Sequence, residues 1–363
     1  MSEVRDRLPS TPRALRSSIM RIARRLVLAA GIMAAAIKLS GAQAQPAATS
    51  TKAIVVHQYG GPQVLKYEDA PRPEPKEDQI LVRVIAATVN PVDTSMRSGK
   101  YAKFFGTTLP FIPGSDIASV VEKTGAKITK FKTGDPIFAY TDLKRGGGYA
   151  QYAVATEVEA ARKPQTMSYV ETAAVPIVAL TAWQALIDTA KLSGRQTVLI
   201  HGGSGGVGTF AIQIAKARGA RVIATASTAN QDLLKQLGAD VAIDYTKQKF
   251  EDVAKDVDVV LDSVGKDTLA RSYGVVKKGG IIVSIVAGLD QAELDKHGIR
   301  GAALSVEPNS EELAEIGKLI DEKKIKVIVS QTFSLSEAIK AQEQVATGHT
   351  RGKIVLKVAE EPK

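Results

Sequence analysis

Cysteine is absent from this sequence of 363 residues, and histidine occurs only four times. The lack of cysteine excludes disulfide bonds, thiolate nucleophiles and every zinc or iron–sulfur site that needs a thiolate ligand. The histidines are scattered rather than paired at metal-ligand spacing. We therefore predict no metal centre, and any cofactor is expected to be organic.

Long hydrophobic runs and clustered basic residues are also missing. The apolar run at residues 26–37 is shorter than the ~20 residues that a membrane-spanning helix needs. The net charge is +10, but most of the excess lies in the first 44 residues and the remainder is spread without a basic block. Nucleic-acid binding usually needs such a block. We expect neither a nucleic-acid partner nor a stable membrane span in the mature chain.

Residues 1–44 predict an export signal. A positively charged stretch precedes the apolar run, and the sequence A-Q-A at 42–44 offers the small side chains that a signal peptidase reads. The paired arginines at 24 and 25 resemble a twin-arginine signal. We expect export to the periplasm. The alternatives are an uncleaved anchor or a cytoplasmic enzyme with a misassigned start.

In the rest of the chain, the predicted pattern of secondary structure changes at about residue 175. Residues 51–174 hold short strands between glycine and proline clusters, which predicts a compact, barrel-like β domain. Residues 175–305 alternate apolar strands with helices, the pattern of a doubly wound parallel sheet covered on both faces. Residues 306–363 add a helix and strands that we assign to the first domain. The predicted fold class is α/β.

The stretch "TVLIHGGSGGVG" carries the strongest functional signal. Gly203, Gly205 and Gly208 fit the pattern G-x-G-x-x-G, after an apolar strand and at the start of a helix. Such glycines permit a tight turn and let backbone N–H groups approach a pyrophosphate at the helix N-terminus. We predict a dinucleotide site at these glycines and at Gly206 beside them.

The end of the following strand indicates which dinucleotide is bound. An NAD site usually has Asp or Glu there, whereas this chain reads "ATASTAN". Ser227 and Asn230 can donate hydrogen bonds to a 2′-phosphate, and Tyr245 is expected to lie across the adenosine. No Lys or Arg stands at the tip. NADPH is favoured over NADH.

Motifs along the whole mature chain carry a family resemblance. They include "AATVNPVDTSMRSGKY", "PFIPGSDIASVVEKTG", "HGGSGGVG", "DVVLDSVG" and "GHTRGKIVLKV". Residues 51–358 resemble the medium-chain dehydrogenase/reductase superfamily, in its zinc-free quinone oxidoreductase and alkenal/enone reductase branch. The resemblance implies a GroES-like β-barrel catalytic domain, a Rossmann domain, and a homodimer formed through the sheet that the terminal "GKIVLKV" strand joins.

The same resemblance implies site residues. It places Asn90, Asp93 and Tyr101 in the cleft where the nicotinamide meets the substrate. Residues expected near the cofactor are Thr181, Val207, Gly208, Ile285 and Arg351. Two structural alternatives stay open: "NPVD" is also a turn that caps a helix, and Tyr101 is also a plausible packing aromatic.

This chain departs from its relatives at four positions. Zinc alcohol dehydrogenases have a ligand histidine in a G-H-E motif, where this chain has Ser115 and Asp116. Alkenal reductases tend to have lysines where this chain has Ser95 and Asn230. The first departure excludes the zinc chemistry, and the second removes positive charge near substrate and cofactor.

We therefore expect an NADPH-dependent reductase of quinones or α,β-unsaturated carbonyls that transfers hydride without zinc. The hydroxyls of Tyr101 and Ser95 and the amide of Asn90 are the candidate donors to the developing negative charge. The alternatives are an enoyl-thioester reductase on the same fold and a non-catalytic NADPH-binding or sensing protein.

Overall fold

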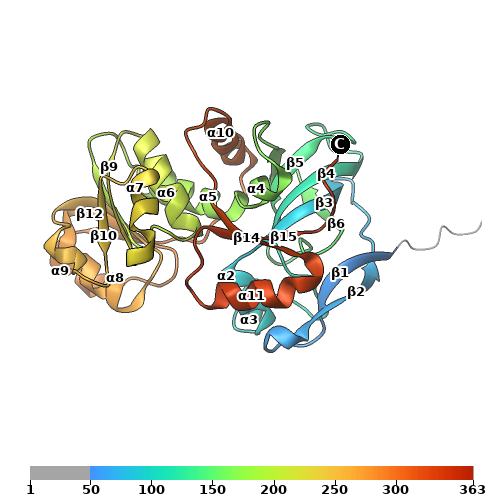
Figure 1. Ribbon diagram of the computed structural model, residues 1–363, viewed down its shortest axis with the longest axis horizontal. Helices are drawn as coiled ribbons and strands as arrows, with labels where there is room; N and C mark the ends of the chain where they lie inside the picture. Colours follow the sequence, from blue (N-terminus) through green and yellow to red (C-terminus); the bar gives the residue numbers. More distant parts are fainter. Residues whose placement is uncertain (1–49, 363) are drawn as a thin grey trace, which may run out of the picture. The chain divides into compact units, whose positions relative to one another are not determined.

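The computed structural model describes residues 50–362 (Figure 1). The export signal expected over residues 1–44 lies outside the described residues. Within the described part of the chain, no helix is both long and apolar enough to cross a bilayer. Three β-sheets and the helices packed against them make up these residues.

Strands from the first part of the described chain and two strands near its C-terminus form a largely antiparallel β domain. Its main sheet has seven strands in the order β14-β15-β3-β4-β5-β7, with β6 paired to β3. The strands are β3 (Gln79–Val89), β4 (Asp116–Thr124), β5 (Pro136–Tyr140), β6 (Tyr152–Thr156), β7 (Ala160–Arg162), β14 (Val329–Ser334) and β15 (Lys353–Lys357). A separate hairpin pairs β1 (Ser50–Val56) with β2 (Leu65–Pro71).

The C-terminal strands enter this sheet beside β3. Strand β15 is antiparallel to β3 and parallel to β14, so both of its edges are hydrogen-bonded. The homodimer expected from the sequence was to form through the sheet that this strand joins. Because an interior strand has no free edge to offer a second chain, β15 itself cannot be the pairing edge.

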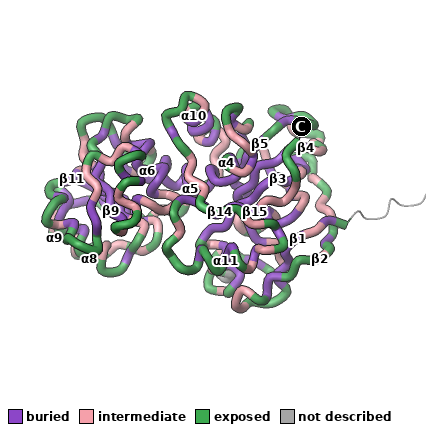
Figure 2. Tube along the Cα trace, in the orientation of Figure 1, coloured by how far each residue is buried: buried purple, intermediate pink, exposed green. Residues whose placement is uncertain are grey.

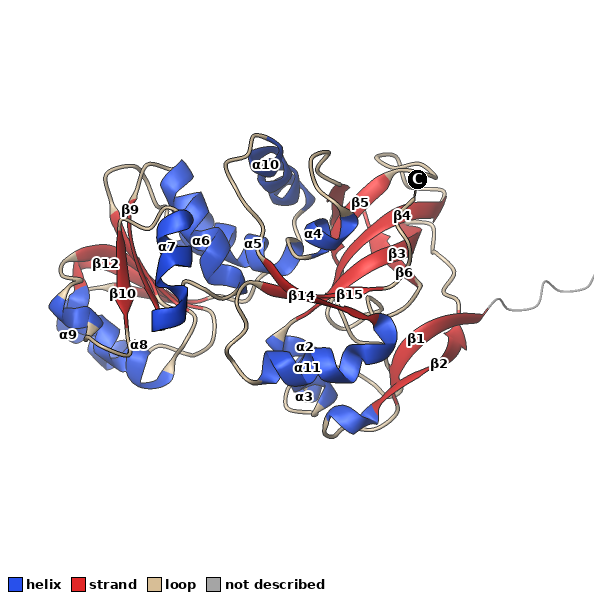
Figure 3. Cartoon of the chain, viewed as in Figure 1, coloured by secondary structure: helices blue, strands red, loops and turns tan. Residues whose placement is uncertain are grey.

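The second sheet is fully parallel (Figure 3). Its order is β10-β9-β8-β11-β12-β13, which is the Rossmann order when the strands are numbered from β8. The strands are β8 (Thr197–Ile200), β9 (Arg221–Ala226), β10 (Val241–Asp244), β11 (Val257–Asp262), β12 (Val276–Ser284) and β13 (Arg300–Ala303). The predicted α/β class with a doubly wound parallel sheet is confirmed.

Helices connect the strands and cover the sheets. They are α2 (Pro91–Arg97), α3 (Ala102–Phe105), α4 (Tyr169–Ala173), α5 (Pro176–Trp183), α6 (Gly206–Ala217), α7 (Gln231–Gln236), α8 (Lys266–Ser272), α9 (Gln291–His297), α10 (Ser310–Asp321) and α11 (Ala338–Ala346). Helix α6 packs on β8 and β9, whereas α10 packs on α5 and β7. A π-helical turn, Gln184–Thr189, continues α5.

One hydrophobic core spans both main sheets. It contains Phe138 of β5, Val198 of β8 and Leu313 of α10. All eight residues of α5 are buried (Figure 2), and most of them belong to this core. Strands buried on both faces read as continuous apolar runs, which explains why β8 and β11 are so apolar. Helix α5 is therefore held rigidly between the two sheets, and its N-terminus reaches the site described next.

Candidate functional site

The glycine turn between β8 and α6 is built so that only glycine fits at its critical positions. A Cβ on Gly208 would stand 2.3 Å from the Gly202 carbonyl oxygen and 2.6 Å from Gly203 Cα. Gly202 itself has a φ of +69°, in the left-handed region that favours glycine. The turn therefore packs directly against the first turn of the helix.

The start of α6 is free to receive an anion. Gly205 precedes the helix with an extended backbone, and no side chain caps α6. The first N–H groups of a helix have no intrahelical partners, and the helix dipole favours negative charge at that end. A Cβ on Gly205 would meet only the Gly202 oxygen, at 3.4 Å. Gly205, Gly206, Val207 and Gly208 thus form a cradle suited to a pyrophosphate.

The loop after β9 is polar, and one of its residues contacts the buried carboxylate of Asp244. The amide of Asn230 donates to Ser227 Oγ at 3.2 Å, and Tyr245 is exposed. Thr228 Oγ1 donates to Asp244 at 2.6 Å. Hydrogen bonds from Thr228 and Thr246 lower the pKa of Asp244 to about 2. No acid is evident at this tip in the sequence, because Asp244 comes from the next strand, β10.

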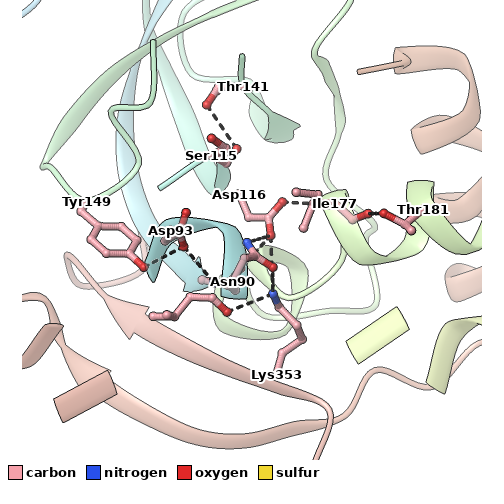
Figure 4. A network of polar contacts seen from close by, with 11 residues as sticks. Asn90, Asp93, Ser115, Asp116, Thr141, Tyr149, Ile177, Thr181 and Lys353 are labelled. Carbon is pink, nitrogen blue, oxygen red and sulfur yellow. Dashed lines mark hydrogen bonds and ion pairs between the residues drawn. The ribbon is translucent and has the colours of Figure 1, made fainter. Parts of the chain in front are cut away.

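A buried polar network lies at the end of β3 (Figure 4). Asn90 precedes α2, and its backbone N–H donates to Asp93 Oδ2 at 2.8 Å. The Tyr149 hydroxyl donates to the same oxygen at 2.9 Å. Burial raises the pKa of Asp93 to about 7, although these two hydrogen bonds act to lower it. Burial also raises the pKa of Tyr149.

The side chain of Asn90 is held at both ends. Its Nδ2 donates to Asp116 Oδ2 at 2.9 Å, and its Oδ1 accepts from the ammonium of Lys353. Asp116 also accepts from the backbone N–H of Ile177, at the N-terminus of α5, at 2.8 Å, and from Thr88 Oγ1, also at 2.8 Å. The network therefore connects β3, β4, α5 and β15.

Lys353 and Asp116 form a buried ion pair, with 3.7 Å between Nζ and Oδ2 and side chains 5% and 0% exposed. Burial lowers the pKa of Lys353, while Asp116 and Asp93 act to raise it. The backbone beside Lys353 touches the glycine turn, because Gly352 N–H donates to the Ser204 carbonyl at 2.8 Å. The anion cradle and the Asn90 network are thus neighbours.

The remaining predicted residues lie around these two features. Thr181 is on α5, where its hydroxyl donates to the Ile177 carbonyl at 2.6 Å. Arg351 precedes Gly352, and Ile285 directly follows β12, with its N–H bonded to the Asp262 carbonyl at 3.0 Å. Thr181 and Arg351 are thus close in sequence to residues of the network, whereas Ile285 follows β12, which belongs to neither feature.

Two predicted donors are not part of the network in the described structure. Tyr101 is 38% exposed and its ring meets Phe105 edge-on. Its backbone N–H is 3.4 Å from the Ser95 carbonyl, so Tyr101 and Ser95 lie together beside α2 and α3. Asn90 and Asp93 are brought together, whereas no side-chain hydrogen bond among the described residues joins Tyr101 or Ser95 to them.

Sequence reasoning missed three residues of the network. Asp116 was considered only as a departure from a zinc motif, and neither Tyr149 nor Lys353 was considered as a site residue. A signal existed for Lys353, because a lysine that begins the apolar strand "KIVLK" in a buried sheet needs a partner. Among the described residues, no group of three or more His, Cys, Asp or Glu is placed to hold a metal ion.

Two regions of the chain match known protein families. Residues 76–165 match the alcohol dehydrogenase GroES-like domain, and residues 237–356 match the zinc-binding dehydrogenase family. The NADPH-dependent alkenal/one oxidoreductase of Arabidopsis thaliana chloroplasts is 36% identical over 316 residues, which cover 84% of this chain and 79% of that protein.

Solved structures agree with these matches. The quinone oxidoreductase of Coxiella burnetii superposes with a TM-score of 0.81 and 37% identity, covering 85% of this chain and 100% of that one. The quinone oxidoreductase of Escherichia coli, solved in complex with NADPH, gives a TM-score of 0.77 and 31% identity over the same shares.

Proposed function

Since this chain belongs to the medium-chain dehydrogenase/reductase superfamily, in its quinone oxidoreductase and alkenal/one reductase branch, we propose that it uses NADPH to reduce quinones or α,β-unsaturated carbonyls without a metal. One observation carries the proposal. The uncapped start of α6 and the Asn90 network are joined through the Ser204–Gly352 backbone contact, so one site combines an anion cradle with buried polar groups.

The glycine turn and the β9 loop support dinucleotide binding. The N–H groups at the start of α6 would hold the pyrophosphate, and Ser227 and Asn230 would hold the 2′-phosphate. An alkenal/one relative is named NADPH-dependent, and the Escherichia coli relative was solved with NADPH. Ser227→Ala should weaken NADPH binding and leave NADH binding unchanged.

The bound dihydronicotinamide supplies the hydride, and the protein supplies position and electrostatics. A reduced enone or quinone develops negative charge on oxygen, and preorganised N–H or O–H donors stabilise that charge most effectively in a water-poor site. The proposed donors are the Asn90 amide and the hydroxyls of Tyr101 and Ser95. Asn90 is only 3% exposed.

Stopped-flow mixing of protein and NADPH with a quinone, an enone and an enoyl thioester tests the proposal. We expect loss of NADPH absorbance with quinones or enones, and slower turnover with NADH. Preferential turnover of the enoyl thioester would reassign the acceptor. Binding without any turnover would favour a sensing role, and calorimetry that finds no binding of either nucleotide would overturn the assignment.

We also propose that residues 1–44 direct export to the periplasm and are removed. The support is the charged stretch, the apolar run and the A-Q-A sequence at 42–44. N-terminal sequencing of protein from its native cell should start at about residue 45, and an intact Met1 would refute cleavage.

A homodimer is proposed by analogy with the family. Strand β13 is an edge strand of the parallel sheet, and most of its residues are exposed. An exposed edge offers unpaired backbone groups to a second chain. Light scattering should give twice the mass of one mature chain, and a monomer would refute the proposal.

A further inference from the structure

The backbone of Lys353 is fixed by the glycine turn. Gly352, the residue before it, has a φ of +61° and no room for a side chain, since a Cβ would stand 2.2 Å from the Ile328 carbonyl oxygen. Its N–H donates to the Ser204 carbonyl. The stem of Lys353 lies against the first residue of α6, with Cδ 3.0 Å from where a Cβ on Gly206 would be.

The ammonium of Lys353 ends among three oxygens. It donates to Asn90 Oδ1, lies 3.3 Å from the Val89 carbonyl oxygen and 3.7 Å from Asp116 Oδ2. A buried ion pair is weak evidence for stability, because its desolvation penalty often cancels the attraction. A role in conformational specificity is the better explanation for a pair at this position.

The ion pair defines the orientation of the Asn90 amide. The oxygen and nitrogen ends of an amide have nearly the same shape, so packing alone does not distinguish the two flipped orientations. Here the oxygen faces the cation and the nitrogen faces the carboxylate. One N–H of Asn90 bonds Asp116, and the second N–H has no acceptor among residues 50–362.

We propose that Lys353 is a positioning residue: together with Asp116 it holds the Asn90 amide so that an N–H, and not the carbonyl, faces the oxygen of the acceptor. The inference rests on the proposed function in one respect, namely that Asn90 faces this oxygen. With the cation removed, the amide oxygen loses its partner and only the hydrogen bond to Asp116 still holds the orientation. A larger share of the protein can then turn the amide oxygen toward the acceptor, where it repels the developing charge. Lys353 thereby also ties the orientation of Asn90 to the cofactor cradle.

A double-mutant cycle on the purified, folded protein tests this role. Loss of one oriented donor commonly lowers kcat about 10²- to 10³-fold, so we expect Lys353→Met to lower kcat at least tenfold while the Kd for NADPH stays within about threefold of wild type. If Lys353 acts through Asn90, Lys353→Met should have no further effect on kcat in an Asn90→Ala background. Multiplying effects would overturn the proposal, because they would mean an independent role.

Lys357→Met is the matched control on the same strand. The Lys357 side chain is 41% exposed and paired with Glu360, so its removal should leave kcat unchanged. If Lys353→Met does not fold because Asp116 is left unpaired, the double variant Lys353→Met/Asp116→Asn removes both charges together. It should show the same loss of kcat, and wild-type kcat in the folded double variant would overturn the proposal.

A readout that needs no turnover separates this inference from the proposed function. In the wild type the side-chain N–H₂ of Asn90 should give two well-separated NMR signals that exchange slowly with solvent. In Lys353→Met these signals should broaden or shift together, whereas Lys357→Met should not affect them. Unchanged Asn90 signals would refute the positioning role even if the wild type reduces quinones. Failure of the wild type to reduce any acceptor would instead refute the function and leave this test decisive.

Discussion

The buried carboxyl of Asp93 should make the protein less stable as the pH rises from about 5 to about 7. Asp93 is 2% exposed, and burial raises its pKa to about 7. Asp93→Asn is the informative change, because an amide keeps an oxygen that can accept from Asn90 N–H and from the Tyr149 hydroxyl. It differs mainly in that it cannot ionise.

The sign follows from which state holds the proton. The unfolded chain releases the proton near the ordinary pKa of 3.8, whereas the folded chain keeps it until about 7. Between these values the folded state binds a proton that the unfolded state does not, so stability falls as the pH rises. Each unit of pKa difference corresponds to about 1.4 kcal/mol. Integrated from pH 5 to 7, the loss is roughly 2 kcal/mol.

Urea denaturation of both proteins at pH 5, 6 and 7 measures the effect. The free energy of unfolding of Asp93→Asn, minus that of the wild type, should grow by about 2 kcal/mol over this range. Asp232→Asn is the control, because that side chain is 91% exposed and its replacement should give a constant difference. A constant difference for Asp93→Asn as well would refute the raised pKa.

Two further predictions concern the Rossmann half of the chain. Burial lowers the pKa of His201 to about 4. Between pH 6.5 and this value, His201 is therefore protonated in the unfolded state but stays neutral in the folded state. When the pH falls from 6.5 to 4.5, the free energy of unfolding of His201→Gln should therefore decrease by about 2 kcal/mol less than that of the wild type. Urea denaturation measures both, and equal decreases would refute this prediction. Gly205→Ala should weaken NADPH binding at least tenfold by calorimetry with little change in Tm, because its Cβ has room in the turn but would occupy space in the cradle that we propose for the pyrophosphate. Gly208→Ala should instead destabilise the fold by about 1–3 kcal/mol or more, and Gly288→Ala, whose Cβ would meet nothing within 4 Å, should alter neither property.

The parallel sheet and the glycine turn could be predicted from the sequence because their signals are local. A buried strand must be apolar along its whole length, and the close approach around Gly208 admits only glycine. Strand β13 carries no such signal. It reads "RGAA" and is mostly exposed, so only its pairing with β12 makes it a strand.

The Asn90 network could be predicted only in part because its members are distant in sequence. Asn90 and Asp93 share one motif, but Asp116 is 26 residues from Asn90 and Lys353 is 263 residues from it. Their meeting depends on the pairing of β15 with β3 and of β3 with β4. Asp244 was missed for the same reason, since its contact with Thr228 depends on the register between β10 and β9.

The charges of the buried residues around Asn90 balance one another. Lys353 and Asp116 cancel one another, and a protonated Asp93 adds no charge, so the surroundings of Asn90 are neutral up to about pH 7. A second carboxylate there would oppose negative charge developing on a bound acceptor, whereas a protonated carboxyl does not. Because the Lys353 ammonium binds the oxygen of the Asn90 amide, it draws electron density from the amide nitrogen and strengthens the remaining N–H as a donor. On the proposed function, the protein would therefore stabilise an enolate or quinol oxygen with an oriented dipole in a neutral setting, and it would need neither a metal ion nor a free cation at that oxygen.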